Sequence, residues 1–210
     1  MTEQLGLMEI LGIAGSVSLL SGWRLYLTVL ATGLAMRFDV LPLPEHLQAL
    51  QALANPWVMG IAGLAAFMEF FADKILWLDS IWDTVHTFIR PVGGALLTLA
   101  VIDPADPATQ AIAFILGGGA SLLAHGGKAS ARAVVNTSPE PFSNIAVSTV
   151  EDVATTGLLY LAYSHPVAAG VVAAVLLVLA VTLMVVAWRV LRKIFLRVQG
   201  EGQPASSADL

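Results

Sequence analysis

The stretch that decides the fold is PVAAGVVAAVLLVLAVTLMVVAW, residues 166–188, because it contains no charged residue. About 20 mostly apolar residues are enough for a helix to span the hydrocarbon core of a bilayer. Beyond the stretch lies a basic cluster made up of Arg189, Arg192, Lys193 and Arg197. Such clusters are enriched on the cytoplasmic side of membrane proteins. The stretch therefore predicts a membrane-spanning helix whose carboxyl end lies in the cytoplasm.

The composition of the whole chain agrees with this prediction. Of 210 residues, 57% are hydrophobic and only 12% are charged, whereas soluble domains have about 25% charged residues. A soluble fold could not cover its surface with so few charges. The net charge of −5 argues against nucleic acid as a partner. We therefore expect a multi-pass membrane protein whose main partner is the lipid bilayer.

The sequence holds no pattern that is typical of an enzyme or of a metal site. It has no cysteine, which excludes thiolate ligands and cysteine nucleophiles. Asp83 and His86 could place two ligands on one helical turn, but two ligands do not make a metal site. We expect no catalytic residue, no metal and no cofactor.

Six apolar segments are candidates for membrane spans. They cover about residues 5–38, 55–72, a segment that includes 90–91 and ends at 103, 108–135, 142–163 and 166–188. As a single helix the first would be roughly 50 Å long at about 1.5 Å per residue, against a hydrocarbon core of about 30 Å. We therefore expect it to tilt strongly or to break, most naturally at Ser21-Gly22.

Two further expectations follow from this count of six spans. Residues 76–89 are amphipathic and form either an interfacial helix or the start of the third span. Six spans place both termini on one side, and the basic cluster puts that side in the cytoplasm. The last residues, 199–210, are predicted to be a disordered cytoplasmic tail.

The chain contains a weak internal repeat. The matches, in the same order in both halves, are Gly22 and Arg24 with Gly126 and Lys128, Glu69 with Glu151, and Arg90-Pro91 with His165-Pro166. We therefore divide the chain into repeats 1–104 and 105–198. Because three spans per repeat is an odd number, the second repeat must cross in the opposite sense. The predicted fold is all-α, with about six transmembrane helices in a 3+3 inverted-topology repeat.

Several charged residues lie inside the predicted spans, where each costs about 2.5–3.5 kcal/mol on insertion scales. The candidate binding residues are Arg24, Glu69, Asp73, Lys128, Glu151 and Asp152. Two interpretations remain open. The first is structural, with buried ion pairs between Arg24 and Glu69 and between Lys128 and Glu151. The second is functional, with a central polar path whose carboxylates take a cation or a proton.

The glycines of the spans also allow two interpretations. The run Gly117-Gly118-Gly119 is typical of close helix packing by small residues. It could instead interrupt a helix and present backbone groups to a ligand, as discontinuous transporter helices do. On the second interpretation Gly22, Gly126 and Gly127 would mark further breaks.

Three stretches of the chain resemble a known family. They are Gly22-Trp23-Arg24, residues 69–91 and residues 126–141. Together they resemble the bacterial membrane-protein family called domain of unknown function 4126, over about residues 10–175. The resemblance implies a membrane location and a bacterial source, and it implies no activity and no ligand residue. Leu76 stands where the family pattern usually has proline, so the resemblance does not carry over a sharp turn there.

These observations lead to two hypotheses about function. The first is a small transporter or channel for an ion or a small polar solute, with its site at the midplane between the two repeats. The second is a membrane scaffold or assembly factor that transports nothing and whose buried charges are structural. The abundant glycine and alanine would suit a homo-oligomer and internal packing equally well.

Overall fold

The computed structural model describes residues 6–40, 45–103, 105–135 and 141–201. These ranges contain helices only, which confirms the all-α class. The elements are α1 (Leu7–Arg37), the 3-10 helix η1 (Glu45–Ala54), α2 (Pro56–Ala72), α3 (Leu76–Ile102), α4 (Pro107–Val135), α5 (Pro141–Ser164) and α6 (Pro166–Glu201). Four helices begin with proline, which is pre-organised for the first helical position.

Five of the described helices are long and apolar enough to cross a membrane, namely α1, α3, α4, α5 and α6. Helix α2 is apolar too but has only 17 residues. The chain is therefore a multi-pass membrane protein, while the count of six spans is not confirmed. The amphipathic residues 76–89 are the first part of α3, so the second of the two alternatives for this segment is correct. A turn at residues 73–75 separates α2 from α3 although Leu76 is not a proline.

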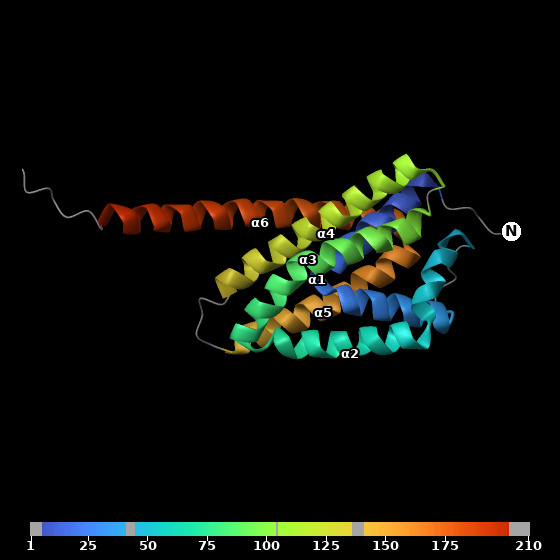
Figure 1. The fold of residues 1–210 in the computed structure, drawn as a ribbon, viewed down its shortest axis with the longest axis horizontal. Helices are drawn as coiled ribbons and strands as arrows, with labels where there is room; N and C mark the ends of the chain where they lie inside the picture. The colour runs from blue at the N-terminus through green and yellow to red at the C-terminus, as the bar shows by residue number, and fades with distance from the viewer. Residues whose placement is uncertain (1–5, 41–44, 104, 136–140, 202–210) are drawn as a thin grey trace, which may run out of the picture.

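Helix α1 reverses its direction at Arg24, whose backbone angles (φ −142°, ψ 70°) are not helical. Near its start, Gly12 packs against the carbonyl of Pro166. Near its end, Thr32 shares a 2.9 Å hydrogen bond with Tyr163. Residues 163 and 166 are neighbours at the α5–α6 junction, whereas a straight helix would separate residues 12 and 32 by about 30 Å. Figure 1 shows the two halves of α1 returning to the same end of the bundle.

This reversal changes the expected topology. The first half of α1 runs from residue 7 to the break, and the second half runs back, so α1 enters the bundle without passing through it (Figure 1). The first described residues and the end of α6 consequently lie at opposite ends of the molecule. The prediction that both ends of the chain share the cytoplasmic side assumed that the first span crosses, so this arrangement does not confirm it and it stays a prediction.

Helix α1 is the centre of the fold, since it contacts η1 and each of the other five helices. Small residues allow these close approaches. A Cβ atom added to Gly12 would overlap the backbone of α6, and one added to Gly22 would overlap the Ser121 carbonyl on α4. The Ser18 hydroxyl donates a hydrogen bond to the carbonyl of Gly117, which ties α1 to α4 once more.

Helix α4 continues without interruption through all of its glycines, so the breaks expected at Gly117, Gly118, Gly119, Gly126 and Gly127 are not present. Packing explains most of these positions. Gly117 and Gly118 face α3, while Gly126 and Gly127 lie against Met184 and Ala180 of α6. An added Cβ at Gly119 would meet open space. The break expected at Gly22 is present in α1, but it lies two residues later, at Arg24.

The matched motifs of the two halves have different local structures. Arg90-Pro91 lies inside α3, whereas His165-Pro166 is the junction from which α6 begins. Arg24 lies at a break and Lys128 inside a continuous helix. The inverted repeat, with its boundary at residues 104 and 105, therefore stays a prediction. Of the expected tail, residues 199–201 belong to α6, and residues 202–210 lie outside the described part.

The close contact at Gly12 predicts an asymmetric effect of two matched substitutions in α1. Gly12→Ala should lower the free energy of unfolding by about 1–3 kcal/mol, because the new methyl group overlaps the backbone of Pro166. Gly15→Ala should be neutral or stabilise by up to about 1 kcal/mol, because an added Cβ there meets nothing within 4 Å. Thermal unfolding of the purified protein in detergent measures both, and equal effects would contradict the packing of α1 on α6.

The reversal of α1 also predicts which side of the membrane each position faces. The chain has no cysteine, so single-cysteine variants carry no background. Leu7 is the first residue of α1 and Phe38 directly follows its end. Leu7→Cys and Phe38→Cys should therefore react with a membrane-impermeant maleimide from the same side of the membrane. Lys193→Cys should react from the opposite side. Labelling of oppositely oriented membrane vesicles checks this. Reaction of positions 7 and 38 from opposite sides would show that α1 crosses the membrane.

Candidate functional site

The break in α1 releases backbone carbonyls that a continuous helix would bond internally. Two cationic side chains from neighbouring helices donate hydrogen bonds to these carbonyls. Arg90 of α3 donates to the Gly22 carbonyl at 3.3 Å, and Lys128 of α4 donates to the Trp23 carbonyl at 3.3 Å. Cations are favoured there because the first half of α1 ends with the negative pole of its dipole. The break is thus held by charges from two other helices.

Arg24 lies at the point of reversal and is 1% exposed. Its guanidinium forms an ion pair with Asp73, which follows the end of α2. It also contacts Glu151 at 3.2 Å and Asp152 at 3.0 Å, both on α5. A further hydrogen bond of 3.0 Å joins it to the Ser148 hydroxyl, one turn earlier on α5. Arg24 therefore connects α1 to α2 and α5 by charge.

Asp73 is the second centre of this network, and its side chain is fully buried. Besides Arg24 it contacts Lys128 at 3.4 Å and Arg132 at 3.2 Å. Arg132 lies one turn after Lys128 on α4 and also binds Glu151 at 2.8 Å and Asp79 at 3.6 Å. We call Arg24, Asp73, Asp79, Lys128, Arg132, Glu151 and Asp152 the central network.

A smaller network surrounds Arg90, which is also buried. Its guanidinium binds Glu69 of α2 at 2.6 Å, Asp83 of its own helix at 3.3 Å, and Nδ1 of His125 on α4 at 2.6 Å. An arginine can only donate, so Nδ1 of His125 accepts and the proton of the neutral ring is on Nε2. Nε2 lies 3.0 Å from the Thr87 hydroxyl, which can accept that proton in a hydrogen bond.

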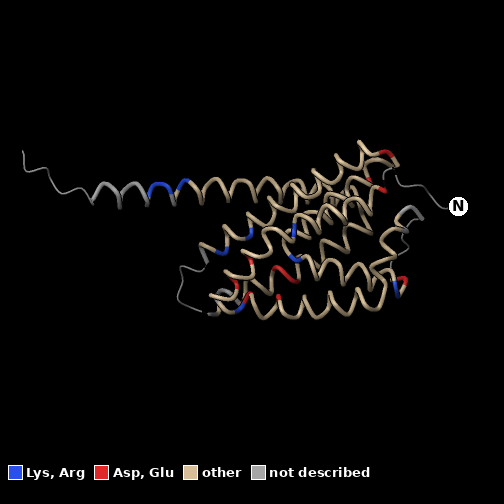
Figure 2. Tube along the Cα trace, in the orientation of Figure 1, with Lys and Arg blue, Asp and Glu red and all other residues tan. Residues whose placement is uncertain are grey.

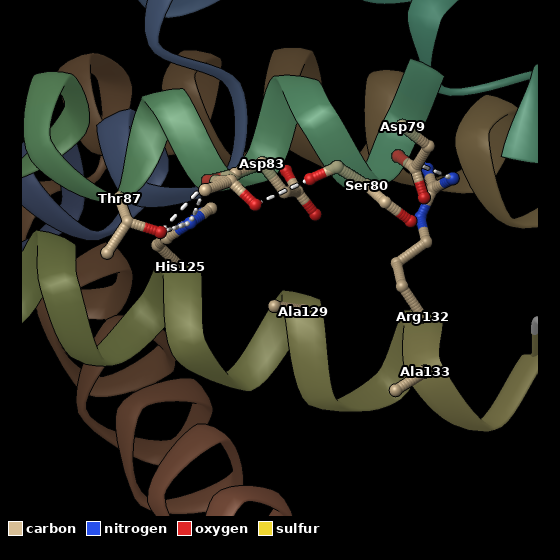
Figure 3. Close-up of a pocket in the computed structure, with 9 residues that line it drawn as sticks. Asp79, Ser80, Asp83, Thr87, His125, Ala129, Arg132 and Ala133 are labelled. Atoms are coloured by element: carbon tan, nitrogen blue, oxygen red, sulfur yellow. Dashed lines mark hydrogen bonds and ion pairs between the residues drawn. The ribbon is translucent and has the colours of Figure 1, made fainter. Parts of the chain in front are cut away.

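Two cavities border these networks. One has a volume of about 250 Å³ and lies between α3 and α4. Figure 3 shows Asp79 and Asp83 on the α3 wall and His125 and Arg132 on the α4 wall, with the small side chains of Ala129 and Ala133 on the same α4 wall. It also borders the exposed residues Ser80 and Thr84, so we call it the α3–α4 cavity.

The other cavity lies at the reversal of α1, between α1, α2 and α5, and has a similar volume of about 250 Å³. Its polar lining consists of Arg24, Glu69, Asp152 and Thr156. We call it the reversal cavity. The central network and the Arg90 network both lie between the two cavities. Figure 2 shows charged residues within the half of the bundle toward which α6 projects, and further charged residues at the opposite end of the bundle.

The structure brings together five of the six predicted site residues. Arg24, Asp73, Lys128, Glu151 and Asp152 belong to the central network. Glu69 does not bind Arg24 as the structural interpretation expected, because Arg90 takes it instead. The other expected pair is present, with Lys128 and Glu151 3.5 Å apart.

Five members of the two networks are not among the predicted site residues, namely Asp79, Asp83, Arg90, His125 and Arg132. A signal for three of them exists in the spacing of α3. Asp79, Asp83, Thr87 and Arg90 follow one another at intervals of three or four residues, so they share one face of that helix. The possible metal pair is not formed, because Asp83 binds Arg90 and His86 bonds the Tyr26 hydroxyl at 2.9 Å.

The charges of the two networks do not balance. Among the described residues they contain six carboxylates, those of Glu69, Asp73, Asp79, Asp83, Glu151 and Asp152. They contain four cationic side chains, those of Arg24, Arg90, Lys128 and Arg132. A fifth, Lys74, lies beside them and donates at 3.4 Å to the Ser148 hydroxyl that Arg24 also binds, so the carboxylates still outnumber the cations. An excess of buried carboxylates is costly unless protons or cations compensate it.

The central position of Asp73 in the network predicts that even a substitution of similar shape lowers the stability strongly. Asp73→Asn keeps the shape but leaves Arg24, Lys128 and Arg132 short of one carboxylate, and it should lower the free energy of unfolding by about 3–5 kcal/mol. Asp39→Asn is the control, because Asp39 is exposed and its left-handed backbone (φ 48°) suits asparagine. Its effect should stay within about 0.5 kcal/mol. Thermal unfolding measures both, and a small effect at Asp73 would contradict its role.

Comparison with known proteins gives one result. The family described as a domain of unknown function (DUF4126) matches residues 11–186, which include every residue of both networks. Neither the curated proteins nor the solved structures contain a match to this chain. Because the matched region covers most of the 210 residues, the protein is a member of the DUF4126 family.

Proposed function

We propose that this protein is a membrane transporter for a small cation or polar solute, and that it is not an enzyme. The observation that carries the proposal is the reversal of α1 at Arg24, within a network of charges that lies between two cavities. Discontinuous helices that present backbone groups and charges near the midplane are the usual construction of transporter sites.

Two chains of polar contacts connect the cavities. One runs from Asp79 through Arg132 and Asp73 to Arg24. The other runs from His125 through Arg90 to Glu69. Each begins at the α3–α4 cavity and ends at the reversal cavity. The structure thus supports a route by which positive charge can pass through the interior of the bundle.

Exchange of ion-pair partners would supply the movement along this route. Arg24 has three carboxylates within reach, and Asp73 has three cations. A proton or cation that binds one carboxylate releases its guanidinium, which can turn to another carboxylate of the network. Protonation of His125 would similarly displace Arg90 from Nδ1, because a protonated ring has no acceptor there. This arrangement supports coupling between protons and the transported cation.

The alternative is a scaffold whose charges only fix the packing of the helices. The burial of Arg24, Arg90 and Asp73 favours it, because buried ion pairs can specify a structure without binding anything. The cavities and the excess of carboxylates favour transport. For the orientation, we propose that the basic end of α6 lies in the cytoplasm of a bacterial inner membrane and that both ends of α1 lie outside.

Flux through proteoliposomes tests the proposal. Vesicles that contain the protein and a trapped pH indicator should show proton movement on addition of at least one member of a panel of monovalent inorganic and organic cations. Asp152→Asn should reduce this movement at least tenfold, because it removes a carboxylate that contacts Arg24 and lines the reversal cavity. Gly15→Ala should not change it. Vesicles in which no cation of the panel moves protons or enters would favour the scaffold.

A further inference from the structure

We propose that the reversal cavity binds an organic cation that carries an aliphatic chain, with the ammonium group beside Glu69 and Asp152. This inference names a substrate class for the proposed transporter, and it rests on the proposed function only where transport is concerned. The argument for binding starts from an unpaired atom. Oε1 of Glu69 binds Arg90 at 2.6 Å, whereas Oε2 has no hydrogen-bond partner among the described residues.

An unpaired carboxylate oxygen is unusual in so buried a side chain, since Glu69 is only 1% exposed. Leaving such an atom without a donor costs about 1–3 kcal/mol, and more when the group is charged. Glu69 borders the reversal cavity, so a ligand there can supply the missing donor. The second carboxylate of the cavity, Asp152, is 26% exposed at its side chain and contacts Arg24 through one oxygen.

The charges around the cavity select a cation. Arg24, the cationic residue that lines it, already binds Asp73, Glu151 and Asp152. Lys74 lies nearby in the chain but does not line the cavity, and its Nζ donates to the Phe70 carbonyl at 3.0 Å and to the Ser148 hydroxyl at 3.4 Å. An anionic ligand in the cavity would therefore meet two carboxylates and one cation, Arg24, that already has three carboxylate partners. An ammonium group has N–H donors for both carboxylates.

The apolar part of the ligand follows from a third cavity. This cavity has a volume of about 240 Å³ and shares Thr156 with the reversal cavity. Apart from Thr156, its lining residues are Ala31, Leu34, Ala35, Val40, Leu159, Tyr160 and Tyr163. It continues along the same face of α5, because positions 152, 156, 159 and 163 recur at helical spacing. Taken together, the two cavities fall in the range of roughly 300–1,000 Å³ that small-molecule sites occupy.

The combination of a polar cavity and an adjoining apolar cavity distinguishes between the possible ligands. A metal ion or a proton would need only the polar cavity, and a neutral lipid chain would need only the apolar one. A ligand with an ammonium group at one end and a short aliphatic chain uses both. We therefore assign the site to an alkylammonium ion whose chain passes Thr156 and lies between the second half of α1 and α5.

Binding of n-octylammonium to the purified full-length protein tests this inference, in a detergent without charge. Octylammonium should raise the unfolding temperature with a saturable dependence on concentration, because it binds the folded state. Octanol and octanoate have the same chain without the positive charge and should bind at least tenfold more weakly. Methylammonium has the charge without the chain and should also bind at least tenfold more weakly. Equal shifts with octylammonium and octanol would overturn the proposal, because they would indicate partition into an apolar surface.

Two variants with a matched control locate the site. Asp152→Asn should weaken octylammonium binding at least tenfold through loss of a charge. Thr156→Phe should weaken it to the same extent by filling the boundary between the cavities, with no change of charge. Thr149→Phe is the control, because Thr149 is also exposed on α5 and also bonds the carbonyl four residues earlier, but it lines neither cavity. Unchanged binding in both test variants would contradict the assignment.

The outcome separates this inference from the proposed function. Saturable binding of octylammonium without any flux in proteoliposomes would support the assigned binding site and contradict the proposed transport. The protein could instead show cation flux but neither bind octylammonium nor respond to it. That result would support the proposed transport and overturn the assigned substrate class.

Discussion

The reversal of α1 at Arg24 is the constraint on which the rest of the structure depends. Inside a membrane every backbone polar group must find a partner within the protein, so a break in a helix is tolerated only where other groups replace the lost hydrogen bonds. Arg90 and Lys128 supply this replacement for the carbonyls of Gly22 and Trp23. Two cations brought into the interior for this purpose then require carboxylates nearby. The break and the two networks are therefore one structural feature.

The fold arranges this feature by placing α1 at the centre. Helix α1 contacts all the other described elements, and its glycines let α4 and α6 approach closely. The charges converge on Arg24 from both sides of the bundle because α3 and α4 carry them on one face and α5 on another. Helices α2 and α6 expose many apolar side chains instead, as lipid-facing helices do. The interior therefore combines an apolar core with buried charges, while large apolar side chains cover the exterior.

Sequence reasoning identified the class of fold and most of the candidate site, because both depend on local signals. Apolar segments give the helices, and charges within them mark buried polar positions such as Arg24 and Asp73. The pairing was predicted only in part: Lys128 does pair with Glu151, but which guanidinium binds Glu69 depends on how α2 meets α3. The reversal of α1 was only half predictable. Length and the small residues at Ser21-Gly22 indicate a break, but the direction of the second half is set by packing against the α5–α6 junction.

The structural and functional interpretations of the buried charges do not exclude each other in this protein. If the network served packing alone, equal numbers of carboxylates and cations would be the least costly arrangement. The described networks contain six carboxylates against four cations, or five with Lys74, and one oxygen of Glu69 has no hydrogen-bond partner among the described residues. The cation binding that we propose would offset this imbalance. The excess of carboxylates therefore supports the proposed binding of a ligand more than a purely structural role.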